Sequence, residues 1–427
     1  MTGAKNLKNL RRLGMENTGS LWFFSGSIVA AGLTFLFQAL MGRLLGPGVF
    51  GALGSLLGLV TVVTLVAGAL QAAITHAVAS EEHRREGSRT ELALRRPFTR
   101  LVFASLVLFA ITAATAPLLK RYLHLNSLVP VLLFGLFLAL SVVCIIPQAV
   151  LLGRIQFKTV ANGLVLNGIV RCICGVALVE LHLGLNGAIL GALLGTAAQL
   201  VIMANPIRKE LTLFGSVQDR LVRYRSVLLA AISLGGVSAF VGVDSVLARH
   251  YLPNAQSGYY IAAATAARIA LFLPAAVTQI AFPHLTKALN DPIKTRRLLR
   301  QSLAIVALLG ASAALVIILF SHLVLAILFG AKFKSAAEAV RILAASAAEM
   351  GILSLMTYFF LARKSILAVL SWIGVTGAAM VIWRYHSSPI QIATIMLCAT
   401  SATLLLQGSA WWLSQSNSQG PKVEAID

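Results

Sequence analysis

Four charged residues stand inside long apolar stretches of this sequence, namely Arg171, Asp244, Arg268 and Glu349. If these stretches cross a membrane, each charge costs ~2.5–3.5 kcal/mol on insertion scales, so each requires a partner or a function. A planar guanidinium can bind a phosphate or a carboxylate through paired hydrogen bonds. A buried carboxylate can exchange a proton or a sodium ion, or it can be the fixed counter-ion of an arginine.

The elements that must position these residues are membrane-spanning helices. Of the 427 residues, 58% are hydrophobic and 11% are charged, and the mean hydropathy is +0.86. A soluble domain is about half apolar and about a quarter charged. Apolar stretches of about 20 residues recur along the chain, which is the length that crosses a bilayer as a helix. We therefore expect an all-α polytopic membrane protein with about 12 transmembrane helices, at residues 21–41, 49–78, 102–119, 129–152, 159–180, 184–204, 226–248, 257–282, 302–329, 336–361, 366–383 and 390–413.

The basic residues set the expected orientation. The net charge is +21, but Lys and Arg lie in short segments between the apolar stretches and form no single stripe, which argues against nucleic-acid binding. With the N-terminus inside, 25 of them fall on the inner side and eight on the outer side. The positive-inside rule then predicts that both termini lie on the cytoplasmic side.

Motifs for catalysis or metal binding are missing from the sequence. The four cysteines, Cys144, Cys172, Cys174 and Cys398, all fall in apolar stretches, which is typical of small buried side chains. There is no P-loop, no H-E-x-x-H and no G-x-S-x-G. We expect no enzymatic activity, no metal, no cofactor and no direct use of ATP.

Two short segments repeat half the chain apart. The segments are "GRLLGPGVFG" at 42–51 and "ARHYLPNAQSG" at 248–258. Placing Pro47 on Pro253 also places Arg43 on Arg249, and it places Gln38 on Asp244. Further along, "LLGR" at 151–154 matches "FLAR" at 360–363 with an offset of 209 instead of 206. The pattern predicts two six-helix lobes related as a parallel repeat.

This repeat divides the chain into expected segments. Residues 1–20 form a basic amphipathic segment on the cytoplasmic surface. The first lobe covers 21–204, a cytoplasmic linker covers 205–225, the second lobe covers 226–413, and a cytoplasmic tail covers 414–427.

Three stretches resemble polysaccharide flippases of the multidrug/oligosaccharidyl-lipid/polysaccharide exporter superfamily. They are "QALMGRLLGPGVFGALGSLLGLVTVVTLVAGALQAAITHAVA" (38–79), "PQAVLLGRIQFKTVANGLVLNGIVR" (147–171) and "VRILAASAAEMGILSLMTYFFLARKS" (340–365). The resemblance covers nearly the whole chain. It implies two lobes arranged as a V, with a cavity between helices 1, 2, 7 and 8 that opens alternately to each side.

The resemblance also implies a cargo and an energy source. The cargo would be an oligosaccharide on a polyprenyl pyrophosphate, moved from the inner to the outer leaflet and driven by a proton or sodium gradient. Partners would be the lipid bilayer, the lipid-linked oligosaccharide, and glycosyltransferases or a polymerase of the same pathway. Two alternatives stay open: a drug or organic-cation antiporter of the same superfamily, and a non-transporting scaffold subunit of glycan assembly.

Each charged residue then receives a candidate role beside a structural one. The substrate-binding candidates are Arg268, Arg249, Arg43 and Arg171, and the ion-coupling candidates are Asp244, Glu349 and His76. Arg268 could instead pair with a carboxylate, and Asp244 could be the counter-ion of Arg268 or Arg249. Structural pairing is favoured for Arg171 and Glu349, an interfacial position for His76, and snorkelling to lipid headgroups over guarding the exit for Arg43 and Arg249.

Overall fold

The computed structural model describes residues 2–84, 94–212, 224–289, 291–363 and 365–416, and every element in these ranges is helical. The first half contains α1 (Thr2–Arg84), α2 (Arg95–Ala114), α3 (Ala116–Tyr122), α4 (Val129–Val143), α5 (Ile145–Gly153), α6 (Phe157–Leu178), α7 (Gly184–Ala204) and α8 (Arg208–Thr212). The second half contains α9 (Tyr224–Tyr251), α10 (Asn254–Ala267), α11 (Phe272–Ala288), α12 (Pro292–Leu319), α13 (Ser321–Leu328), α14 (Ala337–Ala362), α15 (Ser371–Arg384) and α16 (Pro389–Ser416).

The described helices account for the expected number of membrane crossings. Ten helical segments are long and apolar enough to cross a membrane, but two of them, 22–61 and 157–210, are 40 and 54 residues long. At about 1.5 Å per residue each exceeds the ~30 Å of hydrocarbon that one helix needs to cross. The first contains a non-helical glycine, Gly46 (φ 71°), and the second reverses at His182 and Gly184, which also have positive φ. Each is therefore two crossings, and the chain is a multi-pass all-α membrane protein.

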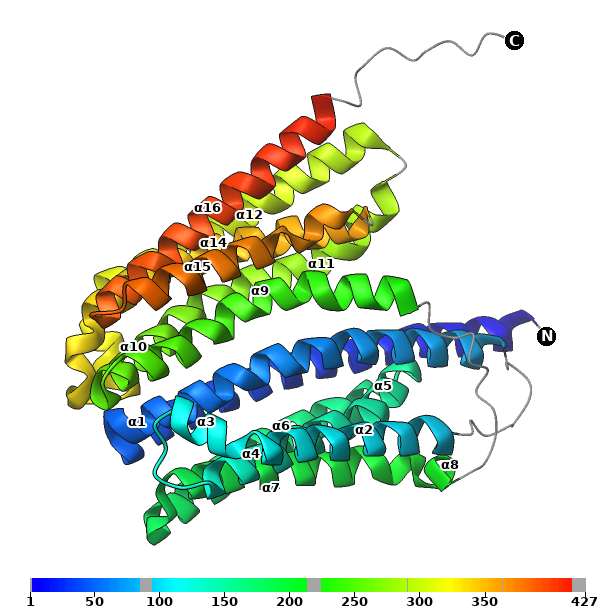
Figure 1. The fold of residues 1–427 in the computed structure, drawn as a ribbon. Coiled ribbons are helices and arrows are strands. Elements are labelled where there is room, and N and C mark those ends of the chain that lie inside the picture. Colours follow the sequence, from blue (N-terminus) through cyan, green and yellow to red (C-terminus); the bar gives the residue numbers. More distant parts are fainter. Residues whose placement is uncertain (1, 85–93, 213–223, 290, 364, 417–427) are drawn as a thin grey trace.

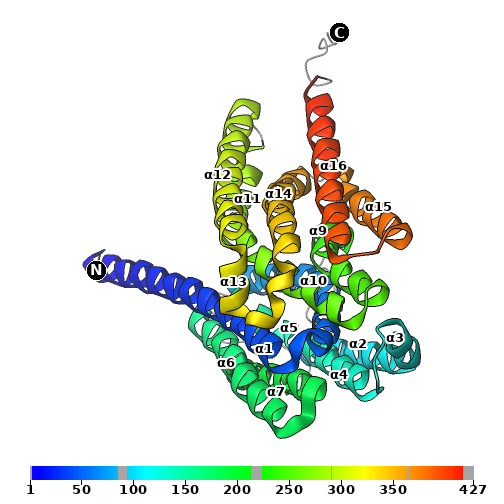
Figure 2. The ribbon, with the colours of Figure 1, turned by 90° about the vertical axis from the view of Figure 1, so that its left-hand side faces the viewer.

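The helices form two groups that converge at one end (Figure 1). We call this the turn end, because it contains the 42–51 segment. We call the opposite end the terminal end, because α1 begins there and α16 ends there (Figure 1). Viewed from the turn end, helices α2, α4, α6 and α7 lie on one side and α11 to α16 on the other (Figure 2). The two halves of the sequence thus form the two arms of a V.

Glycines bring the two groups into close contact. A Cβ atom on Gly51 would lie 3.0 Å from the backbone nitrogen of Gly258, and a Cβ on Gly258 would lie 1.8 Å from the carbonyl oxygen of Pro47. One on Gly58 would lie 2.7 Å from the carbonyl oxygen of Gly242. Because glycine has no side chain, α1 can pack directly against α9 and α10 at these positions.

Matched backbone features occur at the offsets found in the sequence. His124 and Gly330, 206 residues apart, both follow a short helix and both have positive φ, at 50° and 88°. With the offset of 209, the amide of Gln156 donates to the carbonyl of Leu151 as the amide of Ser365 donates to that of Phe360, each at 2.9 Å. These paired features support the parallel repeat.

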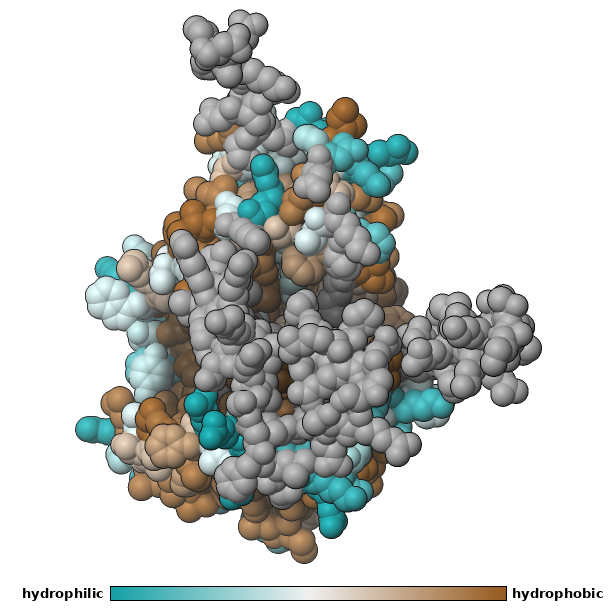
Figure 3. Space-filling view, turned by 90° about the vertical axis from the view of Figure 1, so that its right-hand side faces the viewer, coloured by the Kyte–Doolittle hydropathy of each residue, from teal (hydrophilic) through white to brown (hydrophobic). Residues whose placement is uncertain are grey.

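The sides of the molecule are apolar, as a bilayer requires. Large exposed hydrophobic side chains lie on helices of both groups, among them Phe103, Leu308, Met380, Leu405 and Trp412. Viewed from the terminal end, apolar side chains cover much of the surface around the residues drawn in grey (Figure 3).

Candidate functional site

The site forms around an ion pair between two neighbouring helices. Arg268, at the C-terminal end of α10, donates from Nη2 to Asp244 of α9, at 3.1 Å from Oδ1 and 3.3 Å from Oδ2. The same nitrogen donates to Ser245 Oγ at 3.1 Å. Arg268 and Asp244 are 24 residues apart, and the turn between α9 and α10 brings them together.

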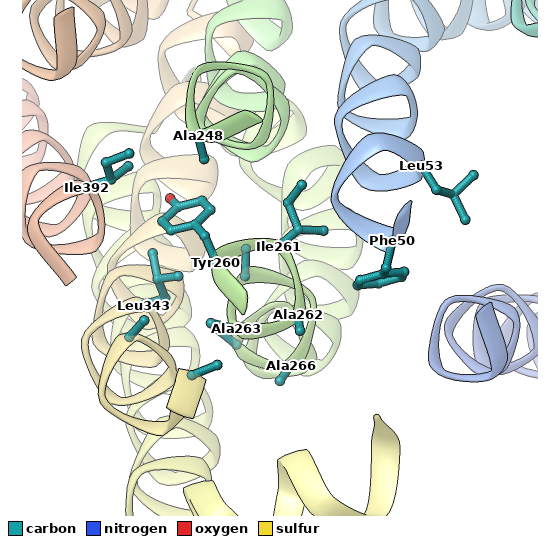
Figure 4. Packing of buried hydrophobic residues seen from close by; sticks show 14 of the residues in the cluster. Phe50, Leu53, Ala248, Tyr260, Ile261, Ala262, Ala263, Ala266, Leu343 and Ile392 are labelled. Carbon is teal, nitrogen blue, oxygen red and sulfur yellow. The ribbon is translucent and has the colours of Figure 1, made fainter. Parts of the chain in front are cut away.

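Other donors complete the hydrogen bonding of the Asp244 carboxylate. Tyr260 donates its hydroxyl to Oδ2 at 3.0 Å, and Ser245 donates its amide and its hydroxyl to Oδ1 at 2.6 and 3.1 Å. The Tyr260 ring is completely buried and packs among Ala248, Leu343 and Ile392 (Figure 4). A carboxylate accepts about four hydrogen bonds, so Asp244 is fully satisfied and held in one orientation.

Arg268 lies close in sequence to a contact between the two halves of the chain. Three residues before it, Thr265 donates to Gln38 of α1 at 3.2 Å. Residues three apart on a helix share a face, so Arg268 is directed toward the same boundary. Its side chain is 26% exposed, against 5% for Asp244. Its contacts within the described residues all use Nη2, which leaves Nη1 and Nε as donors for a ligand.

Glu349 forms a second polar cluster, between α14 and α16. Its carboxylate accepts hydrogen bonds from Thr400 Oγ1 at 2.7 Å and from Ser401 Oγ at 2.8 and 2.9 Å. Ser346 Oγ lies 3.2 Å from Thr400 Oγ1. No basic side chain in the described part of the chain forms an ion pair with Glu349. The cluster is therefore a carboxylate surrounded by hydroxyl oxygens.

The remaining candidates lie away from Arg268. Arg171 stacks over the ring of Phe37, with Cζ 4.3 Å from the ring centroid, inside the first group of helices. Arg43 and Arg249 bind backbone carbonyls at the turn end: Arg43 those of Ile327 and Leu328, and Arg249 those of Gly48, Leu123 and His124. The side chain of His76 lies outside the described residues.

A cavity of about 720 Å³ lies at the turn end, beside Arg249. Its walls are formed by three segments of the first half, 44–49, 124–130 and 182–186, together with Asn254. Within the described residues, no group of three or more His, Cys, Asp or Glu side chains is placed to bind a metal ion.

Several residues of these clusters were missed in the sequence because they are uncharged. Tyr260 and Ser245 fix the orientation of Asp244, and Thr400 and Ser401 bind Glu349. A hydroxyl within an apolar stretch is common in membrane helices, so its residue type gives no functional signal until its partner is known.

Comparison with known proteins places the chain among membrane transport folds. A family model described as "Polysaccharide biosynthesis protein" matches residues 40–338. A search of the curated proteins found no match. The fold is similar to an inward-facing multidrug resistance MATE family transporter of the MOP superfamily, with 13% identity, a TM-score of 0.72, and coverage of 92% of this chain and 99% of that one.

Two further solved structures have related folds. One is the lipid II flippase MurJ in an inward closed conformation, with 14% identity, a TM-score of 0.70, and coverage of 92% of this chain and 87% of that one. The other is a MOP superfamily transporter from Pyrococcus furiosus, described as having a binding pocket of reverse polarity, with 14% identity, a TM-score of 0.59, and coverage of 92% and 96%. The expected V-shaped fold of this superfamily is thereby confirmed.

Proposed function

The chain belongs to the polysaccharide biosynthesis protein family, and from that premise we propose that it moves a lipid-linked oligosaccharide across a bacterial inner membrane. The cargo would be an oligosaccharide on polyprenyl pyrophosphate, transferred from the inner to the outer leaflet by alternating access. The fold shared with transporters and with a lipid II flippase supports this proposal.

The observation that carries the proposal is the position and state of Arg268. It is a partly exposed arginine three residues after an inter-lobe contact. Its Nη1 and Nε have no partner among the described residues, and Asp244 fixes its position. A pyrophosphate or an acidic sugar presents oxygens in the planar arrangement that a guanidinium binds through two hydrogen bonds. Asp244 acts as the positioning residue, and Arg268 acts as the ligand of the anionic part of the cargo.

Orientation and conformation agree with this direction of transport. The Lys and Arg distribution favours an orientation with the turn end outside and both termini in the cytoplasm. The two lobes contact each other at the turn end, through the pairs Gly51–Gly258 and Gly58–Gly242. The conformation is then closed to the outside, which is the state that receives cargo from the inner leaflet.

Glu349 is the group we propose for coupling to an ion gradient. A carboxylate whose partners are hydroxyl oxygens can bind a proton or can share those oxygens with a sodium ion. Asp244 is less suited to this role in the closed state, because its carboxylate already accepts three hydrogen bonds from Ser245 and Tyr260 and also binds Arg268.

The charges at the lobe boundary distinguish this function from export of organic cations. A cation exporter requires an accessible carboxylate, whereas Asp244 is 5% exposed and neutralised by Arg268. A scaffold subunit requires neither residue, and its function would survive their substitution. Glycosyltransferases or a polymerase of the same pathway remain proposed partners.

The deciding experiment is deletion of the gene, followed by measurement of polyprenyl-pyrophosphate oligosaccharides on the inner leaflet. Wild-type protein and the Arg268→Ala variant are then restored separately. We expect the intermediates to accumulate on deletion, to clear with wild type, and to persist with the variant. Absence of accumulation would reject the cargo, and clearance by Arg268→Ala would reject the role of that residue.

A matched control is Arg384→Ala. Arg384 ends α15 and lies over the ring of Tyr385 in its own lobe, with Cζ 5.2 Å from the centroid. This variant removes the same charge from the same lobe but away from the boundary, so it should clear the intermediates as wild type does.

A further inference from the structure

Arg43 and Arg249 occupy equivalent positions in the two halves of the sequence, 206 residues apart. Arg43 lies in the first half, yet it donates to the end of α13 in the second half: Nε binds the carbonyl of Leu328 at 3.0 Å, and Nη2 binds that of Ile327. The guanidinium of Arg43 therefore reaches across the boundary between the lobes.

Arg249 makes the reciprocal contact. It lies in the second half and donates to the two residues that directly follow α3 in the first half, from Nε to the carbonyl of the C-cap residue Leu123 at 2.9 Å and from Nη2 to that of His124 at 3.3 Å. Its Nη1 also binds the carbonyl of Gly48 at 3.0 Å. Ser257, in its own lobe, accepts a further hydrogen bond at 3.2 Å.

The two target helices are themselves equivalent. Both α3 and α13 are short helices that end just before a residue with positive φ, His124 and Gly330, and these residues are also 206 apart. A helix end leaves carbonyl groups without an intrahelical partner, and a cation bound there is favoured. Viewed from the turn end, α3 and α13 lie on opposite sides of the lobe boundary (Figure 2).

We infer that Arg43 and Arg249 form a duplicated lock that holds the turn end closed, each arginine capping the short helix of the opposite lobe. We call these two sets of contacts the arginine lock. It assigns both residues to the conformational equilibrium instead of to cargo binding. Both sets of contacts must break when the lobes separate at the turn end.

The two halves of the lock differ in burial. Arg249 is 3% exposed, whereas Arg43 is exposed. Removal of Arg249 leaves the carbonyl of the buried Leu123 without a donor, while water can replace Arg43. Arg249 should therefore contribute more to closure than Arg43.

The inference rests on the proposed alternating access only in that it assumes a second conformation, with the lobes separated at the turn end. Its test requires no cargo. Spin labels at Asn126→Cys and Lys332→Cys report the distance between the lobes at the turn end. Both positions are exposed, and they are equivalent, 206 residues apart. The distance distribution is measured by double electron–electron resonance on the full chain in lipid nanodiscs, with Cys174 and Cys398 replaced by serine.

Hydrogen bonds from a charged donor are strong enough that losing Arg249 should raise the ratio of separated to closed lobes by about tenfold. Arg43→Ala should raise it less, and the double variant more than either. Arg384→Ala, at the same end, should leave the distribution unchanged. A wild-type distribution in the double variant would overturn the lock, and so would an equal shift in Arg384→Ala.

A double lysine variant keeps the test decisive if the double alanine variant does not fold. Arg43→Lys with Arg249→Lys retains both charges but replaces each planar fork by one ammonium group, so an intermediate shift is expected. A wild-type distribution in this variant would then overturn the lock. A shifted distribution, together with no accumulation of intermediates when the gene is deleted, would retain the lock and reject the proposed cargo.

Discussion

Gln199 and Gln407 have the same role in the two lobes. Gln199, on α7, donates from Nε2 to Gln148 Oε1 at 3.4 Å, and Gln407, on α16, donates from Nε2 to Thr357 Oγ1 at 3.1 Å. The glutamines are 208 residues apart and their acceptors 209 apart. Each lobe therefore contains one glutamine whose amide connects the last membrane crossing of the lobe to its fourth crossing.

The two glutamines should differ in their effect on stability. Gln199 also accepts a hydrogen bond from Asn167 Nδ2 at 2.6 Å, whereas Gln407 Oε1 is buried without a partner among the described residues. Gln199→Leu strands two amides and should cost about 1–3 kcal/mol, but Gln407→Leu also removes an unsatisfied acceptor and should cost less. Thermal unfolding in detergent measures the order, and a larger loss for Gln407→Leu would contradict this account.

The sequence contained enough information for the fold but only part of it for the site. Apolar length predicted the crossings, and the shared prolines at 47 and 253 predicted the duplicated turns. Arg268 and Asp244 were recognisable as charges in apolar stretches. Their pairing was not predictable, because it depends on how α9 and α10 meet.

The partners of Arg43 and Arg249 could not be predicted from the sequence for a different reason. Arg43 binds a carbonyl 285 residues away, and the ligand is backbone, which any residue type provides. Gln199 and Gln407 were overlooked because residues in apolar stretches were selected by their charge, and an amide is uncharged. Their regular spacing was the only signal, and it becomes clear once the hydrogen bonds are known.

The second prediction concerns the contact between the two turns. Gly258→Ala places a Cβ 1.8 Å from the carbonyl oxygen of Pro47, so the lobes must move apart. Gly51→Ala meets Ser257 Oγ at 2.7 Å, and this side chain can rotate away. The contact of the added Cβ with the Gly258 backbone nitrogen, at 3.0 Å, requires only a small shift. We expect Gly258→Ala to broaden the spin-label distances at the turn end strongly and Gly51→Ala weakly. Gly377→Ala, where nothing lies within 4 Å, is the control, and equal behaviour of the three would disprove the packing argument.

The third prediction separates the positioning role of Asp244 from simple stability. Asp244→Asn leaves Arg268 without its counter-ion, so flipping should fall at least about tenfold and unfolding should become easier. Asp244→Asn combined with Arg268→Gln replaces the ion pair by two neutral amides. This double variant should recover most of the stability but none of the flipping, measured by thermal unfolding and by the inner-leaflet intermediates. Recovery of both would assign the pair a structural role alone.

The fourth prediction tests Glu349 as the coupling group. Glu349→Gln keeps an acceptor for Thr400 and Ser401 but cannot lose a proton or neutralise a sodium ion. In proteoliposomes with an imposed proton or sodium gradient, wild type should flip lipid-linked oligosaccharide faster than without the gradient, and the variant should show no acceleration. Glu338→Gln is the matched control, because Glu338 is exposed in the first turn of the same helix. If Glu349→Gln responds to the gradient as wild type does, the hydroxyl cluster only ties α14 to α16, and coupling resides in another group.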